Sequence, residues 1–464
     1  MSEVVEHTKG RQERRFRRWT KVLLLVFGVV AVLGVIAWLV LDAMTRAELE
    51  HALADWKAKG RPVDIAELHQ QPILPEENAA LVYEQAAALA DLSTHEKSLM
   101  GAAESLSMLA ALRETERNEL EAVLRRNGEY LPLLHRAASM EQCQLEIDYA
   151  WAVTPQLTSV AGAAPALRAA ALLAVEGGQV DEAWGFWQDA LGTVRHLDNA
   201  PMLMGQGARA VAFTRSIDAL EALVASGRLT DDQLRQAMVA VKETELRAHF
   251  ARGFGDQLLV ILHHGRTFGS QAVFYEPEFT PAKRFLQLLG RPLTQHDMAT
   301  AVRLMSLGAG LVEQPPYAVR QQMDDWQASL EALTHRTPLS TLMLPPLANA
   351  PAHLTTAEAR QATALVALAL ERYRLARGSY PETLSALVPE FLTDVPVDPF
   401  SGRPVLYINT VGRTVVYSVG EDLRDDGGSS EIGYDLRWGQ NSPKDIVFSL
   451  RPGRGGEGAE GQKP

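Results

Sequence analysis

Cysteine is almost absent from this chain of 464 residues, in which Cys143 is the only one. A lone cysteine excludes an internal disulfide and a zinc site built on cysteine pairs. The sequence also lacks the H-E-x-x-H and G-x-S-x-G patterns, the phosphate-binding G-x-x-x-x-G-K-[ST] pattern and the glycine fingerprint of dinucleotide-binding proteins. We therefore expect no catalytic residue, no organic cofactor and no enzymatic activity.

Basic residues are fewer than acidic residues in this chain. The chain carries 45 Lys and Arg residues against 57 Asp and Glu residues, which gives a formal net charge of −12. Binding to phosphate backbones needs clustered lysines and arginines, so this balance argues against nucleic acid as a partner. The one clear basic cluster is RQERRFRRWTK, residues 11–21, and its position before an apolar run fits a role in membrane orientation.

A long run without charge follows this cluster directly. Residues Val22 to Leu41, VLLLVFGVVAVLGVIAWLVL, are twenty positions, which as a helix match the thickness of a bilayer's hydrocarbon core. The positive-inside rule then predicts a cytoplasmic segment 1–21, a transmembrane helix 22–42 and an extracytoplasmic remainder. A cleaved signal peptide and a buried core helix are the alternatives, although LVLDAMTRA is a poor cleavage site and the run is long for a core helix.

Strand-like alternation is nearly missing between residues 43 and 335, where apolar residues recur at three- and four-residue spacing. This pattern predicts an α-helical domain, 43–335. Two helices are expected around the turn GGQVDEA, and a second pair, 201–226 and 230–250, around ASGRLTDDQ. We expect Thr230 to cap the second helix of that pair and Gly265 to end the helix that follows.

One of these turns resembles part of a tetratricopeptide repeat (TPR). In GGQVDEAWGFWQDAL, four residues have the spacing of the glycine, alanine, aromatic and alanine positions that pack the two helices of such a repeat: Gly178, Ala183, Trp187 and Ala190. No regular repeat period follows, so we expect helical hairpins with TPR-like packing. Such an array serves either as a concave surface for a partner or only as the packing of a core.

Proline gathers in HRTPLSTLMLPPLANAPAHLTT, which predicts a linker over residues 336–354 because proline interrupts helices and central strands. A small α+β domain is expected over residues 355–450. It starts with a long helix ended by Gly378 and continues with the strands VLYIN and TVVYSV, joined by a tight turn, and the strand DIVFSL. The Gly-rich, charged tail, residues 451–464, is expected to be disordered.

Three short motifs follow one another in this C-terminal region. They are Tyr-x-x-x-x-Gly-x-Tyr-Pro at a helix end, Asp-Pro-aromatic-x-Gly-x-Pro, and Tyr-Ser-x-Gly-x-Asp in a strand that leads into an acidic loop. The positions are filled by Tyr373, Gly378, Tyr380, Pro381, Asp398, Pro399, Phe400, Gly402, Pro404, Tyr417, Ser418, Gly420 and Asp422. In this order they resemble the C-terminal half of the G-type, or major, pseudopilin of type II secretion systems.

In that family the loop after the strand binds calcium, so the resemblance implies a calcium site here. Carried over residue by residue, the metal ligands are Asp422, Asp425, Asp426 and Glu431, with backbone carbonyls completing the oxygen shell that calcium needs. The alternative is a solvated Asp/Gly surface turn without an ion. The family's leader, cleavage site and helix glutamate have no counterpart around Val22 to Leu41, so we do not expect assembly into a filament.

The chain combines an N-terminal anchor, the segment GRPVDIAEL followed by PEENAA, a helical middle and a pseudopilin-like end. This whole layout resembles membrane-anchored proteins of planctomycete-type bacteria. It implies a location in the bacterial cytoplasmic membrane, with the region after residue 42 in the periplasm or otherwise outside the cytoplasm. We therefore expect a single-pass envelope protein whose helical domain contacts envelope or secretion proteins. Two alternatives stay open: a membrane-tethered hydrolase with its active site in the helical domain, and a C-terminal domain that keeps only the fold while the helices carry the function.

Overall fold

The structure is a computed structural model, and it describes residues 2–67, 72–90, 92–102, 114–148, 154–268, 281–333, 350–429, 432–435, 440–443 and 445–451. Most of these residues are helical, which confirms a mainly α fold with a small C-terminal sheet. The helices are α1 (Ser2–Ala58), α2 (Ala79–Leu89), α3 (Thr94–Ala102), α5 (Glu114–Arg126), α6 (Tyr130–Ser139), α7 (Leu157–Glu176), α8 (Val180–His196), α9 (Met202–Ala225), α10 (Asp231–Lys242), α11 (Leu246–Phe268), α12 (Pro281–Val312), α13 (Pro316–Leu333) and α15 (Ala350–Arg377). Short 3-10 turns are η1 (Ile65–Glu67), η2 (Pro75–Glu77) and η5 (Leu384–Leu387), and the strands are β1 (Leu406–Thr410), β2 (Arg413–Ser418), β3 (Ile432–Asp435), β4 (Gln440–Pro443) and β5 (Ile446–Arg451).

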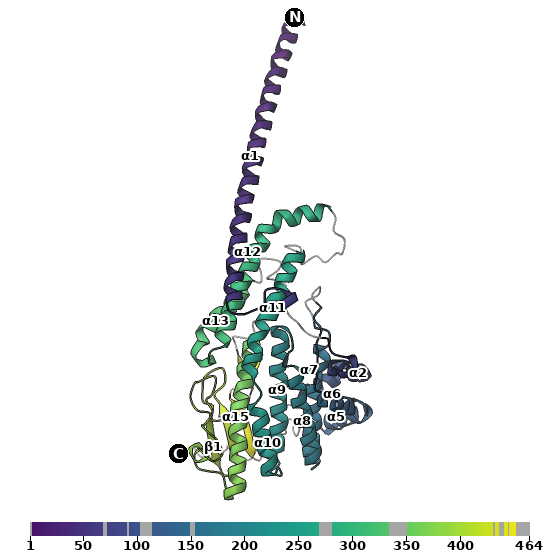
Figure 1. Cartoon of the computed structure of the whole chain (residues 1–464), viewed down its shortest axis with the longest axis vertical. Coiled ribbons are helices and arrows are strands. Elements are labelled where there is room, and N and C mark those ends of the chain that lie inside the picture. The colour runs from purple at the N-terminus through teal and green to yellow at the C-terminus, as the bar shows by residue number, and fades with distance from the viewer. Residues whose placement is uncertain are drawn as a thin grey trace, which may run out of the picture.

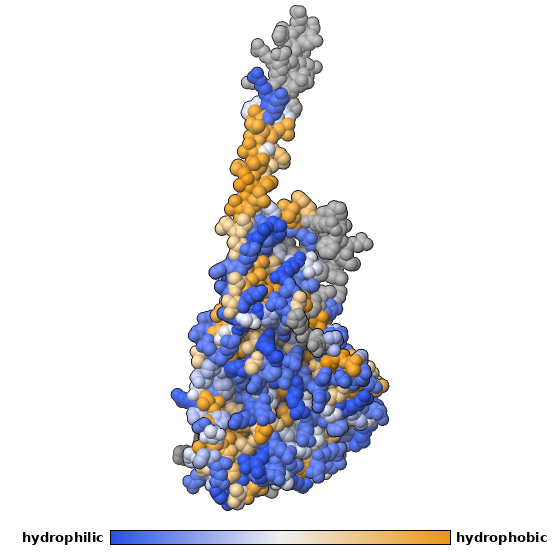
Figure 2. Space-filling model, in the orientation of Figure 1, coloured by the Kyte–Doolittle hydropathy of each residue, from blue (hydrophilic) through white to orange (hydrophobic). Residues whose placement is uncertain are grey.

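A single helix, α1, joins the basic N-terminal segment to the body of the protein. It is continuous over a longer stretch than the predicted span 22–42, because the sequence contains no proline from Ser2 to Ala58. Within it, Arg18–Ala58 contains an 18-residue window of mean hydropathy 3.0, none of which is buried in the molecule. Figure 1 shows α1 projecting from the body, and Figure 2 shows an apolar band along the projecting part. This exposed apolar length is consistent with a membrane anchor.

The hairpin of α7 and α8 lies in the helical body. Gly178 turns the chain between the two helices at φ +75°, a conformation that a residue with a side chain rarely adopts. α7 is also long and apolar enough to cross a membrane, but 61% of its apolar window is buried, as in the core helix of a soluble domain. The α8 side chains Ala183, Trp187 and Ala190 are buried as well. The hairpin is thus as predicted, while packing like that of a tetratricopeptide repeat remains a prediction.

Thr230 caps α10 as predicted. Its hydroxyl oxygen accepts the backbone N–H of Gln233 at 3.2 Å, and the Gln233 side chain accepts the backbone N–H of Thr230 at 3.0 Å. Both ends of this capping box satisfy backbone donors that a helix start leaves open. The single helix predicted over 230–250 is two in the structure, because α10 ends at Lys242 and α11 begins at Leu246.

Two other predicted helix ends are wrong. α11 runs past Gly265 to Phe268, since a glycine within a packed helix costs only about 1 kcal/mol relative to alanine. α15 begins at Ala350, so the end of the predicted linker is helical. Pro351 is tolerated there because the first turn of a helix has no use for the missing N–H. The rest of the predicted linker, 336–349, lies outside the described residues.

The C-terminal sheet follows α15, which ends at Arg377 before Gly378 at φ +83°. Its strands are antiparallel in the order β1-β2-β5, which confirms the three predicted strands, and a tight turn at Val411 and Gly412 joins the first two. The β3–β4 hairpin was not predicted, because IGYD is only four residues long and QNSP contains no apolar strand-forming residue. The predicted disordered tail lies, after Arg451, outside the described residues.

α15 and the sheet share one core with the helical body. α15 packs against α9, α10 and α11 on one side and against β2 and β5 on the other, and the buried apolar residues from α1 to β5 form one cluster. Polar contacts cross the same boundary. Arg360 of α15 forms ion pairs with Asp218 and Glu221 of α9 and donates to the Val447 carbonyl at 2.7 Å. Glu221 also accepts the N–H of Ser449 at 2.9 Å, so these partly buried hydrogen bonds tie β5 to the helices.

Candidate functional site: the acidic turn and the pocket beside it

Asp398, which opens the Asp-Pro-Phe motif, is buried and joins two of the three C-terminal motifs. Its Oδ1 accepts the Ser418 hydroxyl at 2.7 Å and the Phe400 N–H at 3.0 Å. Its Oδ2 accepts the Ser401 hydroxyl at 2.8 Å and the Val419 N–H at 3.3 Å. A buried carboxylate is tolerated when its oxygens are hydrogen-bonded in this way. The second and third motifs therefore meet at one side chain, where β2 leads into the acidic turn.

The acidic turn, residues 421–429, is held by hydrogen bonds between its own residues. Asp422 Oδ1 accepts the N–H of Arg424 at 3.0 Å, and Asp425 Oδ1 accepts the N–H of Gly427 at 2.9 Å. These bonds to the backbone two residues on are typical of aspartates in turns. Asp425 Oδ1 also accepts the hydroxyl of Tyr417 at 2.9 Å, which connects the turn to β2.

The structure describes three of the four predicted calcium ligands. Asp422, Asp425 and Asp426 are exposed on the turn, and Glu431 lies outside the described residues. In the part of the chain that the structure describes, no three His, Cys, Asp or Glu side chains gather as a metal-binding group. A calcium shell takes roughly six to eight oxygens, so the predicted carboxylates need backbone carbonyls to complete it.

Asp445, which sequence reasoning missed, lies fully buried against the acidic turn. Its Oδ2 accepts the N–H of Gly428 at 2.8 Å and of Ser429 at 3.2 Å, while its Oδ1 is buried without a hydrogen-bond partner among the described residues. Burial raises the pKa of Asp445, and the backbone N–H donors oppose that rise. An unpartnered buried carboxylate oxygen is unfavourable, and a cation would satisfy it.

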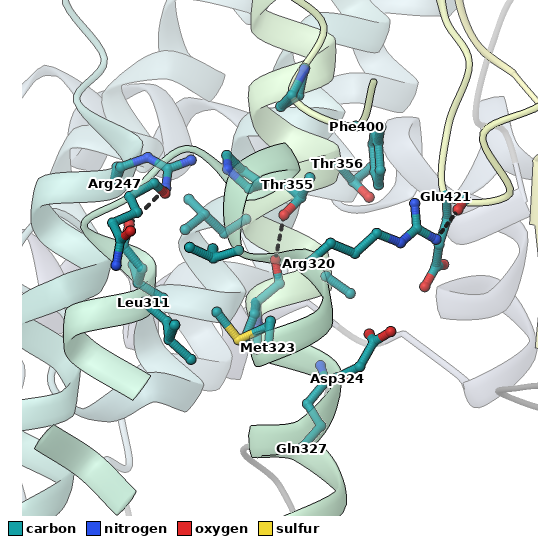
Figure 3. Close-up of a pocket in the computed structure, with 18 residues that line it drawn as sticks. Arg247, Leu311, Arg320, Met323, Asp324, Gln327, Thr355, Thr356, Phe400 and Glu421 are labelled. Atoms are coloured by element: carbon teal, nitrogen blue, oxygen red, sulfur yellow. Dashed lines mark hydrogen bonds between the residues drawn. The ribbon is translucent and has the colours of Figure 1, made fainter. Parts of the chain in front are cut away.

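A pocket of about 100 Å³ opens beside the acidic turn, between α13, the start of α15 and the Asp-Pro-Phe segment (Figure 3). Its lining is mainly apolar and includes Leu311, Met323 and Phe400. The turn contributes Glu421, whose carbonyl accepts a hydrogen bond from Arg320. Arg320 Nη1 is buried without a hydrogen-bond partner among the described residues. The pocket thus combines apolar walls with a guanidinium group that has donor capacity to spare.

Arg247 lines the same pocket, and its guanidinium group connects α12 to α15. It donates to the Val312 carbonyl at 2.6 Å and forms an ion pair with Glu358, so it ties the end of α12 to α15. Burial raises the pKa of Glu358, and the Arg247 charge opposes that rise. Because these contacts use the donors of Arg247, Arg320 is the cation of this pocket that is better placed to bind a ligand or partner group.

A second pocket, of about 500 Å³, lies at the N-terminal end of α9 within the helical body. Asp256 of α11 lines it, and burial raises the pKa of this carboxyl to about 6, while the N–H of Met202 and the charge of Arg252 oppose the rise. A carboxyl with a pKa near neutrality is a candidate for general acid or base chemistry. His196 and Cys143 line the same pocket.

Neither His196 nor Cys143 is disposed for catalysis. His196 Nδ1 lies 3.1 Å from the hydroxyl of Tyr83, and its Nε2 lies 2.9 Å from the carbonyl of Met140, so both ring nitrogens are engaged. Burial raises the pKa of Cys143 to about 12, which keeps the thiol protonated and weakly nucleophilic. The second pocket therefore contains one carboxyl with a raised pKa, Asp256, and neither His196 nor Cys143 acts as a nucleophile beside it.

Some of these residues left a trace in the sequence and others did not. Asp445 is an acidic residue directly before the apolar strand IVFSLR, a position at which burial of its carboxylate could have been considered. Arg320 and Asp256 lie within ordinary helical sequence. Their environment comes from segments distant in the chain, such as Glu421 for Arg320 and Met202 for Asp256.

Comparisons with known proteins give no match: no family model, no curated protein and no solved structure matches the chain. The resemblances to G-type pseudopilins and to membrane-anchored proteins of planctomycete-type bacteria therefore remain predictions. They are carried by the motif residues and the layout of the chain.

Proposed function

We propose that this chain is a single-pass envelope protein that holds a helical interaction domain on the outer side of the bacterial cytoplasmic membrane. The observation that carries the proposal is that α1 has an exposed apolar part and a part buried in the body. None of its most apolar window is buried in the molecule, whereas Ala52 and Trp56 near its C-terminal end are buried in the body. One continuous helix would thus link the bilayer to the body without a flexible linker.

The basic segment 11–21 supports the orientation, because clustered Arg and Lys beside a transmembrane helix favour the cytoplasmic side. The helical body would then face envelope or secretion proteins. The apolar pocket beside Arg320 and Phe400 supports such an interaction, since interfaces are anchored by apolar groups that enter pockets beside a polar group. No enzymatic activity is part of this proposal.

Calcium is proposed as a structural ion of the acidic turn, with Asp422, Asp425, Asp426 and Glu431 as ligands. The buried, unpartnered Oδ1 of Asp445 supports it, because a cation at the turn would offset that negative charge. The ion would supply charge neutralisation and ordering of the turn and no chemical step.

Labelling of single cysteines in intact cells tests the orientation. In a Cys143→Ser background, Val411→Cys places a thiol at a fully exposed position in the turn between β1 and β2, and Arg18→Cys places one before the apolar run. A membrane-impermeant maleimide is expected to label the first position only, provided that the outer envelope is permeabilised. Labelling at Arg18→Cys alone would contradict the orientation, and release of the protein by alkaline carbonate would contradict the anchor.

Thermal melting of the full-length protein tests the calcium proposal. With calcium at about 100 times its dissociation constant, a site confined to the folded state adds about 2.7 kcal/mol to the free energy of unfolding. We expect a higher melting temperature with calcium than with chelator, a difference lost in Asp425→Asn and Asp426→Asn. The exposed Glu382 of the same region provides the control Glu382→Gln, which should keep the difference.

A membrane-tethered hydrolase is the second candidate, and the raised pKa of Asp256 in its pocket of about 500 Å³ favours it. Ester and glycoside hydrolysis assays of the purified protein, with Asp256→Asn as the matched variant, separate the two candidates. Turnover that depends on Asp256 would replace the interaction protein with the enzyme as the working proposal.

A further inference from the structure

α12 lies beside α1 and runs in the same direction, so its contacts show how the two helices are aligned. The indole Nε1 of Trp38 donates to the carbonyl of Leu289 at 3.1 Å. Four residues further along α1 and two further along α12, Arg291 Nε donates to Asp42 Oδ1 at 2.6 Å, and the guanidinium group also lies over the Trp38 ring. Leu289 is therefore level with Trp38, which stands three residues before the end of the apolar run Val22 to Leu41.

The first part of α12 does not continue along α1. Figure 1 shows that it bends where it meets α1 and runs across the axis of that helix. The sequence accounts for the bend, because Pro292 cannot donate an N–H to the carbonyl of Leu288 and Gly290 lies close by. If α1 crosses a bilayer, this part of α12 lies along the bilayer surface.

The transverse part of α12 exposes large apolar side chains. The exposed fractions are 59% for Phe285, 47% for Leu288, 49% for Leu289 and 49% for Leu293. Their spacing of three, four and eight residues from Phe285 puts all four on one helix face. Figure 2 shows apolar surface on this segment beside the lower end of the apolar band of α1. A contiguous exposed apolar patch of this kind is typical of a membrane or protein contact.

We propose that residues 281–293 form an interfacial helix that lies flat on the outer leaflet, with Phe285, Leu288, Leu289 and Leu293 at the boundary of headgroups and acyl chains. The inference rests on the proposed membrane anchor. The lipid surface is the occupant because the patch is continuous with the span of α1 and lies at the level of Trp38, a residue type enriched at membrane interfaces. Attachment to the membrane through both α1 and residues 281–293 would fix the rotation of the body about the axis of α1.

Spin labels on the full-length protein in vesicles of phosphatidylcholine and phosphatidylglycerol test this inference. Three single-cysteine variants in the Cys143→Ser background suffice: Leu288→Cys in the patch, Val30→Cys in α1, and Val239→Cys on an exposed part of α10. Accessibility to oxygen and to a water-soluble nickel complex gives the depth of each label. We expect Val30→Cys to be deepest, Leu288→Cys to lie about 5–10 Å into the boundary of headgroups and acyl chains, and Val239→Cys to lie in water.

Each other outcome has a distinct meaning. A deep Val30→Cys label with Leu288→Cys in water overturns the interfacial helix and leaves the anchor intact. A Val30→Cys label in water overturns the anchor and the interfacial helix together. A Leu288→Cys label shielded from both reagents overturns the lipid contact in favour of packing against a second copy of the chain.

A variant of the patch provides an independent readout. Phe285→Gln with Leu288→Gln removes apolar area from exposed positions, so the melting temperature should not change. A label at Leu293→Cys is expected to move from the lipid boundary into water in this variant, while Val30→Cys stays deep. An unchanged depth at Leu293→Cys would overturn the inference.

Discussion

At the residue scale, Asp445 connects a buried charge to an exposed acidic turn. We expect Asp445→Asn to keep the fold in chelator, because its amide oxygen can still accept the N–H groups of Gly428 and Ser429. The same variant should lose the rise in melting temperature on calcium addition, since it removes the negative charge that a cation would offset. Thermal melting with calcium and with chelator measures both effects. An Asn variant with the full calcium response would contradict the role of Asp445.

The raised pKa of Asp256 predicts that the free energy of unfolding depends on pH. Its pKa is raised from 3.8 to about 6, mainly by burial, so the folded state binds this proton more tightly than the unfolded state. The resulting stabilisation is complete below a pH of about 3.8 and is lost as the pH rises through about 6. Asp256→Asn cannot titrate, so its melting temperature relative to the parent should increase between about pH 4 and pH 7.5. A constant difference across that range would show that the carboxyl titrates normally.

Arg360 predicts a large effect of one substitution. It pairs with Asp218 and Glu221, both largely buried, so Arg360→Met removes the cation of Glu221 and leaves Asp218 with Arg168 alone. Breaking a buried pair on one side costs about 3–5 kcal/mol in the free energy of unfolding. Arg235→Met is the matched control, because its pairs on α10 are exposed and contribute little. Guanidinium titration of both variants measures the difference, and equal losses would contradict the buried network.

The sequence predicted single residues well where a local rule applies and poorly elsewhere. Thr230 as a helix cap and Gly378 as a helix end depend only on neighbouring residues, and both are confirmed. The burial of Asp445 and the orphaned Nη1 of Arg320 depend on contacts with distant segments. Gly265 shows the limit of a local rule, since packing keeps a glycine within α11.

At the scale of elements, the packing of α12 between α11 and α13 depends on Gly308. A Cβ at this position would come within 2.5 Å of Phe254 and 2.7 Å of Trp326. Gly308→Ala is therefore expected to lower the free energy of unfolding by about 1–3 kcal/mol through overpacking. Gly310→Ala is the matched control, because its added methyl group meets no atom of the described chain within 4 Å and alanine favours the helix. Chemical denaturation measures both, and a loss at Gly310→Ala equal to that at Gly308→Ala would contradict the close approach.

Elements were predictable where the apolar period is long, and their ends were not. The strands β1, β2 and β5 lie where the alternation of apolar and polar residues predicted them. α10 and α11 were merged in the prediction because the helical period continues through their junction. There Gln361 of α15 donates to the carbonyls of Val241 and Thr244 at 2.7 and 2.9 Å, a tertiary contact that leaves no local pattern.

At the scale of the whole molecule, the apolar run of α1 and the helical majority could be predicted from composition and period. The pairing of α1 with α12 and the position of α15 against α9 could not, because each joins segments far apart in the chain. The same contacts decide what can fold alone. α15 buries residues on both of its packed sides, and its polar groups also reach α9 through Arg360.

A fragment of residues 350–451 should therefore not fold by itself, although the motifs of the C-terminal region all lie within it. Without α9, α10 and α11, the helix would expose Ala357, Ala364 and Leu368, which are fully buried in the chain, and Arg360 would lose its carboxylate partners. Exposure of these side chains lowers the free energy of unfolding by about 25 cal/mol for each Å² of apolar surface. Circular dichroism and amide hydrogen exchange of the fragment, compared with the full-length protein in detergent, measure the outcome. A cooperatively melting, exchange-protected fragment would show instead that the sheet and α15 are an independent domain docked on the helices.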